Sequence, residues 1–296
     1  MEAIFDTDLL LARKRRAFER GDGDARFLMH RTAEDLEERL ATVTRRFDRA
    51  AALFCLLPDA AAAIARSGKA DSIVRVEADG RLLADDPSGI VAPPETVPLD
   101  AESIGLAVSL MTLHEINDVP GLLVQIRRAL RPDGLFLGAM AGAGTLQELR
   151  QSLLQAETEL SGGAAPRVSP FADVRDVGGL LQRAGFALPV ADTETVTVRY
   201  ATMFDLMRDL RAMGATNALA QRSRRPTSRH LFLRAAEIYQ EQFSDPDGRI
   251  RATFNTIWMS GWTPHGSQQK PLKPGSAKVS LKTVLSPEGE GGKEGD

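Results

Sequence analysis

The stretch that decides the fold is 104-IGLAVSLMTLHEINDVPGLLVQIRRALRPDGLFLGAM-140. Its first apolar run, residues 106–111, has the length and composition of a buried strand. A helical pattern follows between Pro120 and Arg131, with leucine and isoleucine on one face and arginine on the other. A second apolar run occupies residues 135–140. This order predicts a βαβ unit with two parallel, buried strands.

The two turns of this unit have the residues that such turns require. Asp118 stands where it can cap the free amides of the helix, and Pro120 fits the first helical turn. Pro132-Asp133-Gly134 ends the helix and turns the chain into the second strand. Open α/β sheets bind ligands at the carboxyl ends of their strands, so a ligand is expected at residues 111–118.

Composition sets broad limits on the class of protein. The chain has 296 residues, of which 43% are hydrophobic and 26% charged, and its formal net charge is -3. Its single cysteine excludes an internal disulfide framework and favours a reducing, cytoplasmic location. No apolar run approaches the ~20 residues of a membrane span. The near-neutral charge indicates no nucleic-acid partner, and no metal-ligand spacing predicts a metal site.

The remaining pattern indicates an α/β fold with a doubly wound sheet. We expect N-terminal helices at residues 1–48, a domain at 49–270 with a helical lid inserted at about 202–243, and a disordered tail at 271–296. Two arginine clusters, 13–16 and 222–225, are more typical of solvated helix faces than of binding patches. Strands are expected at 50–57, 72–76, 89–92, 106–111, 135–140, 193–200 and 250–262.

Helix starts are predicted from capping residues. The pairs Thr32–Asp35 and Thr145–Glu148 have the spacing of capping boxes. Asp173 is expected to cap a helix that Gly185 closes. Further helices are expected at 6–20, 202–214 and 228–243.

Several segments carry a family resemblance. The run SLMTLHEINDVPGLLVQIRRALRPDGLF at 109–136 resembles class I S-adenosylmethionine-dependent methyltransferases, and its LH-x-x-ND-x-P…ALRPDG wording is most similar to the BioC-like branch and to relatives of mitochondrial complex I assembly factor 5. The segments at 167–186, 203–219 and 254–278 resemble the assembly-factor group as well. The resemblance spans roughly residues 5 to 278.

The resemblance implies a seven-stranded, Rossmann-like sheet whose last strand is antiparallel. It also implies S-adenosylmethionine as cofactor, held across the ends of strands one, two and four. Glu77 matches the acid that binds the ribose at the end of strand two, and Glu95 matches an acid near the adenine edge. Cys55 and Met111 would lie beside the same cofactor.

The turn after strand one departs from the family pattern. Where the family has an acid, this chain has Ala52, and where the family has glycines it has Phe54, Leu56 and Pro58. Glycine serves there because it lacks a side chain and tolerates positive φ. The ribose-binding half of the expected site is therefore retained and the methionine-binding half is lost.

Four residues are candidates for contacts with a substrate. His114, at the end of strand four, could act as a general base, but no second histidine, Asp–His pair or metal-ligand spacing supports this, so a structural histidine at a turn is favoured. Tyr200, Arg211 and Trp258 fall on or beside the expected lid, where they could contact a substrate or simply pack. The polar segment His265 to Lys278 is a candidate contact for a protein partner.

Two functional hypotheses follow. In the first, the protein is an S-adenosylmethionine-dependent enzyme, or a protein modifier of the assembly-factor type, which resemblance links to arginine hydroxylation of a complex I subunit. In the second, it is a cofactor-free pseudo-enzyme that keeps the fold as a binding module for the assembly of a respiratory complex. The substituted turn at 52–58 favours the second, and titration with the cofactor discriminates between them.

Overall fold

The computed structural model describes residues 3–84, 86–163 and 165–268. The expected tail at 271–296, and all of the candidate contact segment beyond residue 268, lie outside the described residues. Residues 1–264 form one compact unit. Within that unit the sheet has seven strands in the order β3-β2-β1-β4-β5-β7-β6. The strands are β1 (Phe47–Leu53), β2 (Ala70–Glu77), β3 (Ile90–Val91), β4 (Ile104–Leu110), β5 (Leu130–Ala141), β6 (Ala187–Tyr200) and β7 (Ile250–Trp262).

The helices alternate with these strands along the chain. Two short 3₁₀ turns also occur, η1 (Asp24–Arg26) and η2 (Leu113–Glu115). The α-helices are α1 (Thr7–Arg20), α2 (Phe27–Thr42), α3 (Asp59–Ser67), α4 (Gly80–Leu83), α5 (Val119–Ala129), α6 (Gln147–Ser161), α7 (Val174–Arg183), α8 (Met203–Ala212) and α9 (Arg229–Phe243).

The βαβ unit expected from the opening stretch is present as β4, α5 and β5. The strands are parallel, with Val108 opposite Leu137, and every residue of β4 is buried. Asp118 caps α5 by accepting a hydrogen bond from the Gly121 amide at 2.8 Å. The order strand, helix, strand is confirmed. The expectation that Pro132-Asp133-Gly134 ends the helix is wrong, because α5 ends at Ala129 and the chain is extended from Leu130. Asp133, with a positive φ of 63°, lies at an irregularity inside β5, where the pairing with β4 shifts.

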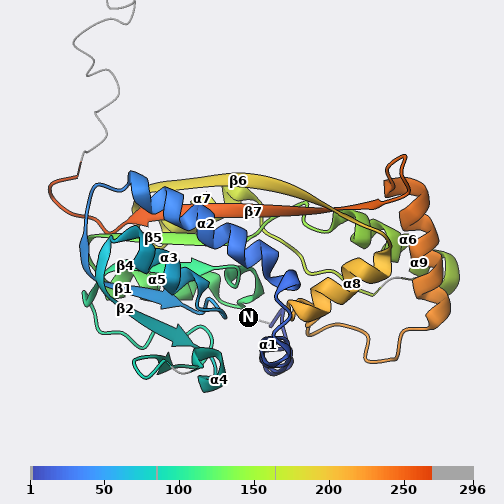
Figure 1. Ribbon diagram of the computed structural model, residues 1–296, viewed down its shortest axis with the longest axis horizontal. Helices are drawn as coiled ribbons and strands as arrows, with labels where there is room; N and C mark the ends of the chain where they lie inside the picture. Colours follow the sequence, from blue (N-terminus) through green and yellow to red (C-terminus); the bar gives the residue numbers. More distant parts are fainter. Residues whose placement is uncertain (1–2, 85, 164, 269–296) are drawn as a thin grey trace, which may run out of the picture. The chain divides into compact units, whose positions relative to one another are not determined.

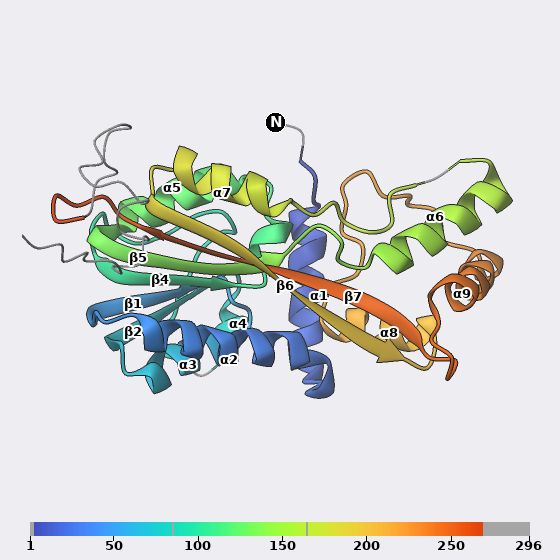
Figure 2. The same cartoon turned by 90° about the horizontal axis from the view of Figure 1, so that it is seen from above.

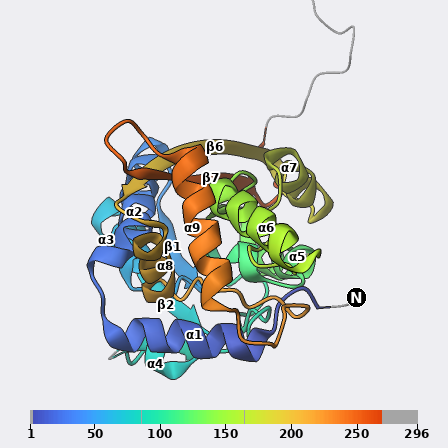
Figure 3. The same cartoon turned by 90° about the vertical axis from the view of Figure 1, so that its right-hand side faces the viewer.

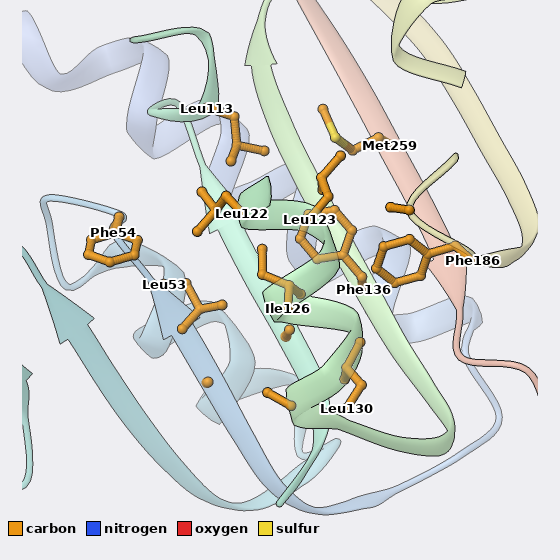
Figure 4. Packing of buried hydrophobic residues seen from close by; sticks show 14 of the residues in the cluster. Leu53, Phe54, Leu113, Leu122, Leu123, Ile126, Leu130, Phe136, Phe186 and Met259 are labelled. Atoms are coloured by element: carbon orange, nitrogen blue, oxygen red, sulfur yellow. The ribbon is translucent and has the colours of Figure 1, made fainter. Parts of the chain in front are cut away.

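Helices cover both faces of the sheet (Figures 1 and 2). On one face, α5 and α7 pack against a core that includes Leu123, Ile126 and Phe136; Figure 4 shows this packing. On the other face, α2 and α3 supply Leu36 and Ile64 to a second core. Burial on both faces is what makes the central strands continuous apolar runs.

The last two strands reach beyond the others. β6 and β7 pair antiparallel from Ala187–Trp262 to Tyr200–Ile250, and their far ends meet α6, α8 and α9 (Figures 1 and 3). There a third core, which we call the lid core, joins these helices through Leu206, Tyr239 and Phe254 among others. Helix α1 lies between these helices and the body of the sheet (Figure 2).

Some predicted boundaries are wrong, for physical reasons. Strand one ends at Leu53 rather than at residue 57, because Phe54 turns to a positive φ of 53°. Helix α2 begins at Phe27, and the hydroxyl of Thr32 donates to the carbonyl of Leu28 inside the helix instead of capping its start.

Helix α6 also begins differently from the prediction. Its first residue is Gln147, preceded by Leu146 in a left-handed conformation without a side-chain cap. Thr145 and Glu148 do not form a capping box: Thr145 bonds the backbone of Asn255, and the carboxylate of Glu148 accepts from Thr253 on β7. Tertiary pairing with β7 replaces the local cap. The cap by Asp173 forms as predicted, and Thr202 and Ser228 cap the helices that were expected to begin there.

Candidate functional site

The turn after β1 keeps the backbone shape of a glycine turn although it contains no glycine. Phe54 and Leu56 have φ values of 53° and 65°, in the left-handed region that favours glycine. The Phe54 amide donates to the Val76 carbonyl at 2.7 Å, which fixes the turn against β2. The expectation that these residues do not tolerate positive φ is therefore wrong for Phe54 and Leu56. Their side chains are what changes the site.

The side chain of Phe54 is buried, with 6% of its surface exposed, and it packs beside Leu53 and Val76 in the core (Figure 4). The Leu56 side chain is half-buried. Leu56 lines both of the cavities that flank the turn. The turn thus presents apolar side chains where bare backbone would otherwise be open to a ligand.

Glu77 ends β2 as expected, but it is 2% exposed. Burial raises the pKa of its carboxyl to about 8, and the Arg75 guanidinium and the amides of Leu56 and Cys55 oppose that rise. Arg75 lies 3.7 Å away, with its guanidinium nitrogens bonded to carbonyls of the chain at 82–83. Among the described residues, Glu77 Oε1 has no hydrogen-bond partner.

A small cavity of about 60 Å³ lies beside Glu77 and the substituted turn. Helix α1 forms part of its wall and contributes Leu10, Leu11 and Lys14. The Lys14 ammonium pairs with the Glu115 carboxylate at 2.8 Å, and both side chains are nearly buried. Helix α1 therefore closes over the ends of β1, β2 and β4.

Further ion pairs hold α1 in this place. Arg15 pairs with Asp79 at 3.0 Å, and Arg81 pairs with Glu19 at 3.2 Å. Both partners lie at the start of α4, immediately after β2. Such half-exposed pairs contribute little individually, and as a group they fix the position of the helix.

Glu95 and Asn117 anchor the segment before α1. The Glu95 carboxylate accepts from the Asn117 amide at 2.7 Å. The Asn117 side-chain oxygen accepts in turn from the amides of Ile4 and Phe5, at 2.8 and 2.9 Å. The residue predicted at an adenine edge is thus tied, through Asn117, to the chain's own N-terminal segment.

Cys55 and Met111, the other residues predicted at a cofactor, lie in different surroundings. The Cys55 thiol is fully buried, and burial raises its pKa to about 12. It accepts a hydrogen bond from the Leu110 amide at 3.4 Å. Met111 has a φ of 58° and lines a second, larger cavity.

This larger cavity has a volume of about 640 Å³. It is bounded by α1, by the ends of β4 and β5, by the lid core and by the loop 215–227. Apolar side chains form much of its wall. Its charged side chains are one carboxylate, Glu115, and seven cations: Arg13, Lys14, Arg26, Arg167, Arg211, Arg222 and Arg224.

His114 lines the larger cavity at the end of β4. Its Nδ1 accepts a hydrogen bond from the Ala141 amide at 3.3 Å, so the neutral ring carries its proton on Nε2. Burial lowers the pKa of His114 to about 4. The ring is therefore a neutral donor near pH 7, which fits a ligand contact better than a general base.

Of the three residues predicted to contact a substrate from the lid, Arg211 lines the larger cavity. Tyr200 is 8% exposed within the lid core, and Trp258 is 1% exposed in the sheet core beneath the Arg39 guanidinium, 4.4 Å away. Neither borders the cavity. The arginine clusters at 13–16 and 222–225, expected to be solvated, each contribute residues to its wall.

A family model described as a methyltransferase domain matches residues 50–138. A malonyl-[acyl-carrier protein] O-methyltransferase from Methylovorus sp. (strain MP688) is 32% identical over 294 residues, covering 93% of each chain. The chain belongs to the class I methyltransferase family. A putative methyltransferase structure from Bacillus halodurans shares the fold, with a TM-score of 0.54, 14% identity, and coverage of 78% of this chain and 98% of that one.

The chain is also similar to proteins named NDUFAF5. It is 46% identical over 192 residues to the protein named "Arginine-hydroxylase NDUFAF5, mitochondrial" in Danio rerio, which is 65% of this chain and 60% of the relative. It is 44% identical over 187 residues to the protein of that name in Dictyostelium discoideum, covering 63% of this chain and 43% of the relative. The chain thus spans about half the length of these curated relatives.

The small cavity beside Glu77, the residue matched to the ribose-binding acid, does not fit S-adenosylmethionine. The cavity there is about 60 Å³, whereas sites for small molecules and cofactors span roughly 300–1,000 Å³. Phe54, Leu56 and residues of helix α1 line this small cavity. Glu77 faces this cavity with Arg75 beside it, not an open groove in which ribose hydroxyls could reach it.

Two further observations apply to the described residues. They contain no cluster of three or more His, Cys, Asp or Glu side chains that could hold a metal ion. No helix in the described part of the chain is long and apolar enough to cross a membrane.

Proposed function

We propose that this class I methyltransferase-like protein is a pseudo-methyltransferase: a binding module that does not use S-adenosylmethionine at the family's cofactor position. The observation that carries the proposal is the closed turn after β1, where Phe54 and Leu56 hold the glycine-type backbone but add side chains. Helix α1, with the Lys14–Glu115 pair, closes the same position from above.

The activities named for the relatives have different requirements. Methylation of a malonyl thioester requires a methyl donor bound beside the substrate. The side chains in the turn after β1 disfavour binding of such a donor. Arginine hydroxylation would bring a guanidinium to the site. The larger cavity is lined by seven cations, of which Lys14 pairs with Glu115, Arg167 with Glu157 and Arg222 with Asp6. The remaining positive charge disfavours a further guanidinium. The geometry supports binding more than either reaction.

The resemblance to the assembly-factor group supports a role in the assembly of a respiratory complex, with a protein of that complex as partner. If so, loss of the gene in the native host reduces the amount of assembled complex I on native gels, and the wild-type gene restores it. Unchanged levels of the complex without the gene would contradict this part of the proposal.

Isothermal titration calorimetry tests whether the protein binds S-adenosylmethionine. We expect neither heat of binding nor a rise in Tm at millimolar cofactor. The double variant Phe54→Gly/Leu56→Gly, which removes the two side chains from the turn, is the matched comparison. Micromolar binding to the wild-type protein, lost in Glu77→Ala, would overturn the proposal.

A further inference from the structure

The loop 215–227 and helix α1 together build a cluster of arginines at the larger cavity. Arg13 donates from Nη1 to the carbonyl of Thr216 at 2.9 Å and also bonds the carbonyl of Asn217. Arg222 donates from Nη1 to the carbonyl of Leu219 at 2.8 Å. Backbone carbonyls carry no net charge, so these bonds orient the guanidinium groups without neutralising them.

The negative charge in this cluster is smaller than the positive charge. Asp6 pairs with Arg222 at 3.0 Å and also interacts with Arg224. Arg13 lies near the same carboxylate, and burial together with the charge of Arg222 lowers the pKa of Arg13. Three guanidinium groups therefore surround one carboxylate. Arg13 and Arg222 are partly buried and Arg224 is exposed. Like charges held close together at a partly buried wall are costly unless an anion joins them.

Another part of the cavity wall is apolar. The lid core contributes Leu149, Leu153, Met207, Phe232 and Phe254 to it. A ligand that fits both parts of the wall has an anionic end and a hydrocarbon part. The neutral His114 ring, which carries its proton on Nε2, stands on the same cavity as a donor for an acceptor oxygen.

We propose that this cavity binds an acyl chain whose head group carries a carboxylate or a phosphate, with Arg13, Arg222 and Arg224 at the head and the lid core around the chain. The volume of about 640 Å³ is within the range of sites that enclose ligands of this size. This inference rests on the proposed function only in taking this cavity, and not the family's cofactor position, as the binding site.

Calorimetric titration of the full-length protein with dodecanoate and with dodecyl phosphate, each below its micelle concentration, tests the inference and separates the two head groups. Dodecanol lacks the charge and inorganic phosphate lacks the chain. We expect at least one of the charged amphiphiles to bind about tenfold or more tightly than both of these, because hydrogen bonds to a charged group are roughly twice as strong as those between neutral groups. Equal binding of dodecanol, or no binding of either charged amphiphile at millimolar concentration, would overturn the proposal.

Variants locate the site. Arg224→Gln changes an exposed side chain that makes no hydrogen bond within the described residues, so the fold is expected to survive, and binding is expected to weaken severalfold. Arg13→Gln is expected to weaken binding about tenfold or more. Arg175→Gln, on an exposed face of α7 outside the cavity, is the matched control and should bind as the wild type does. Equal affinity in all three variants would exclude this cavity as the site.

The two proposals fail in distinguishable ways. If S-adenosylmethionine binds, the proposed function fails, whatever the amphiphiles do. If neither S-adenosylmethionine nor any amphiphile binds, only the ligand class proposed for the larger cavity fails.

Discussion

The two left-handed residues of the strand-one turn show how a functional loop can lose its chemistry and keep its shape. Phe54 and Leu56 adopt φ values of 53° and 65°. A side chain in this region costs about 1 kcal/mol or more, which the packing of Phe54 in the core offsets. The half-buried Leu56 has less packing to offset its cost, so it provides the cleaner test.

We expect Leu56→Gly to be more stable than Leu56→Ala, by about 1 kcal/mol, because glycine relieves the left-handed strain that alanine retains. Denaturant unfolding of the two variants measures the difference. The same pair of substitutions at Leu53, which has no positive φ, should show the usual order, with alanine more stable. An identical order at both positions would show that strain at residue 56 is negligible.

Burial of Glu77 predicts a dependence of stability on pH. The carboxyl has a pKa of about 8 in the native state against 4.5 when unfolded. Between these values the native state keeps a proton that the unfolded chain has released, so stability falls as pH rises from about 4.5 to about 8. Glu77→Gln should remove this fall, and near pH 8 its Tm should exceed that of the wild type by about 5 °C.

Thermal unfolding of both proteins between pH 5 and 9 measures the effect. The comparison is needed because other groups titrate in this range: Asp35, whose pKa burial raises to about 6, and His114, whose pKa burial lowers to about 4. The difference between the two proteins isolates Glu77. A constant difference in Tm across the range would mean that Glu77 does not take up a proton on folding.

At the scale of elements, α1 covers the small cavity beside Glu77, and the N-terminal segment precedes it. Asn117 holds the segment through the amides of Ile4 and Phe5. The neighbouring Asp118 has a different task, because it caps α5 at Gly121. The two adjacent side chains therefore stabilise two separate elements, which permits a matched comparison.

We expect Asn117→Ala to speed amide exchange at Ile4 and Phe5 while leaving the first turn of α5 protected. Asp118→Ala should do the reverse, with faster exchange at Gly121. Each substitution should cost about 1 kcal/mol in the free energy of unfolding. Hydrogen exchange followed by NMR distinguishes these residues. Faster exchange at both places in both variants would mean that the segment and α5 open as one unit.

Elements were predictable where local chemistry decides them. Strand β7 spans residues 250–262 as expected, and the caps at Asp173, Thr202 and Ser228 mark helix starts through bonds to amides of the first turn. Prediction failed where distant residues decide. Glu148 bonds Thr253 across more than a hundred residues, and no local pattern distinguishes that from a capping box.

The candidate site follows the same division. The sequence predicted that Glu77 ends a strand, that His114 follows one, and that the turn after strand one lacks glycine. Each of these depends only on the position of a residue along one strand. The two arginine clusters contain exposed residues, as expected, namely Arg16, Arg224 and Arg225. Their contribution to the wall of the larger cavity could not be predicted, because only the fold brings α1 to the loop 215–227. Burial of Tyr200 and Trp258 depends likewise on the tertiary packing of the lid core and of the sheet.

At the scale of the whole molecule, the hydrophobic interior is divided. Two cores line the faces of the sheet, and the lid core lies around the far ends of β6 and β7. The larger cavity borders α1 and the ends of the strands on one side and the lid core on the other. Apolar contacts that a continuous core would make between these parts are reduced there. Regions joined by few buried contacts open separately from the rest of a protein.

We therefore expect the amides of α8 and α9 to exchange through a partial opening of lower free energy than the global unfolding that exposes β4. Leu206→Ala, at a fully buried position of the lid core, should lower the opening free energy of α8 and α9 by about 2–5 kcal/mol. Leu106→Ala, equally buried in β4, should lower the free energy of the global transition.

Native-state hydrogen exchange at increasing denaturant separates the two transitions. In Leu206→Ala, the amides of β4 should still exchange through an opening of higher free energy than the opening that exposes the amides of α8 and α9. If instead both sets of amides exchange at one common free energy in the wild type and in both variants, the molecule unfolds as a single unit. The lid core would then be part of one cooperative structure, and a ligand in the larger cavity would stabilise sheet and lid together.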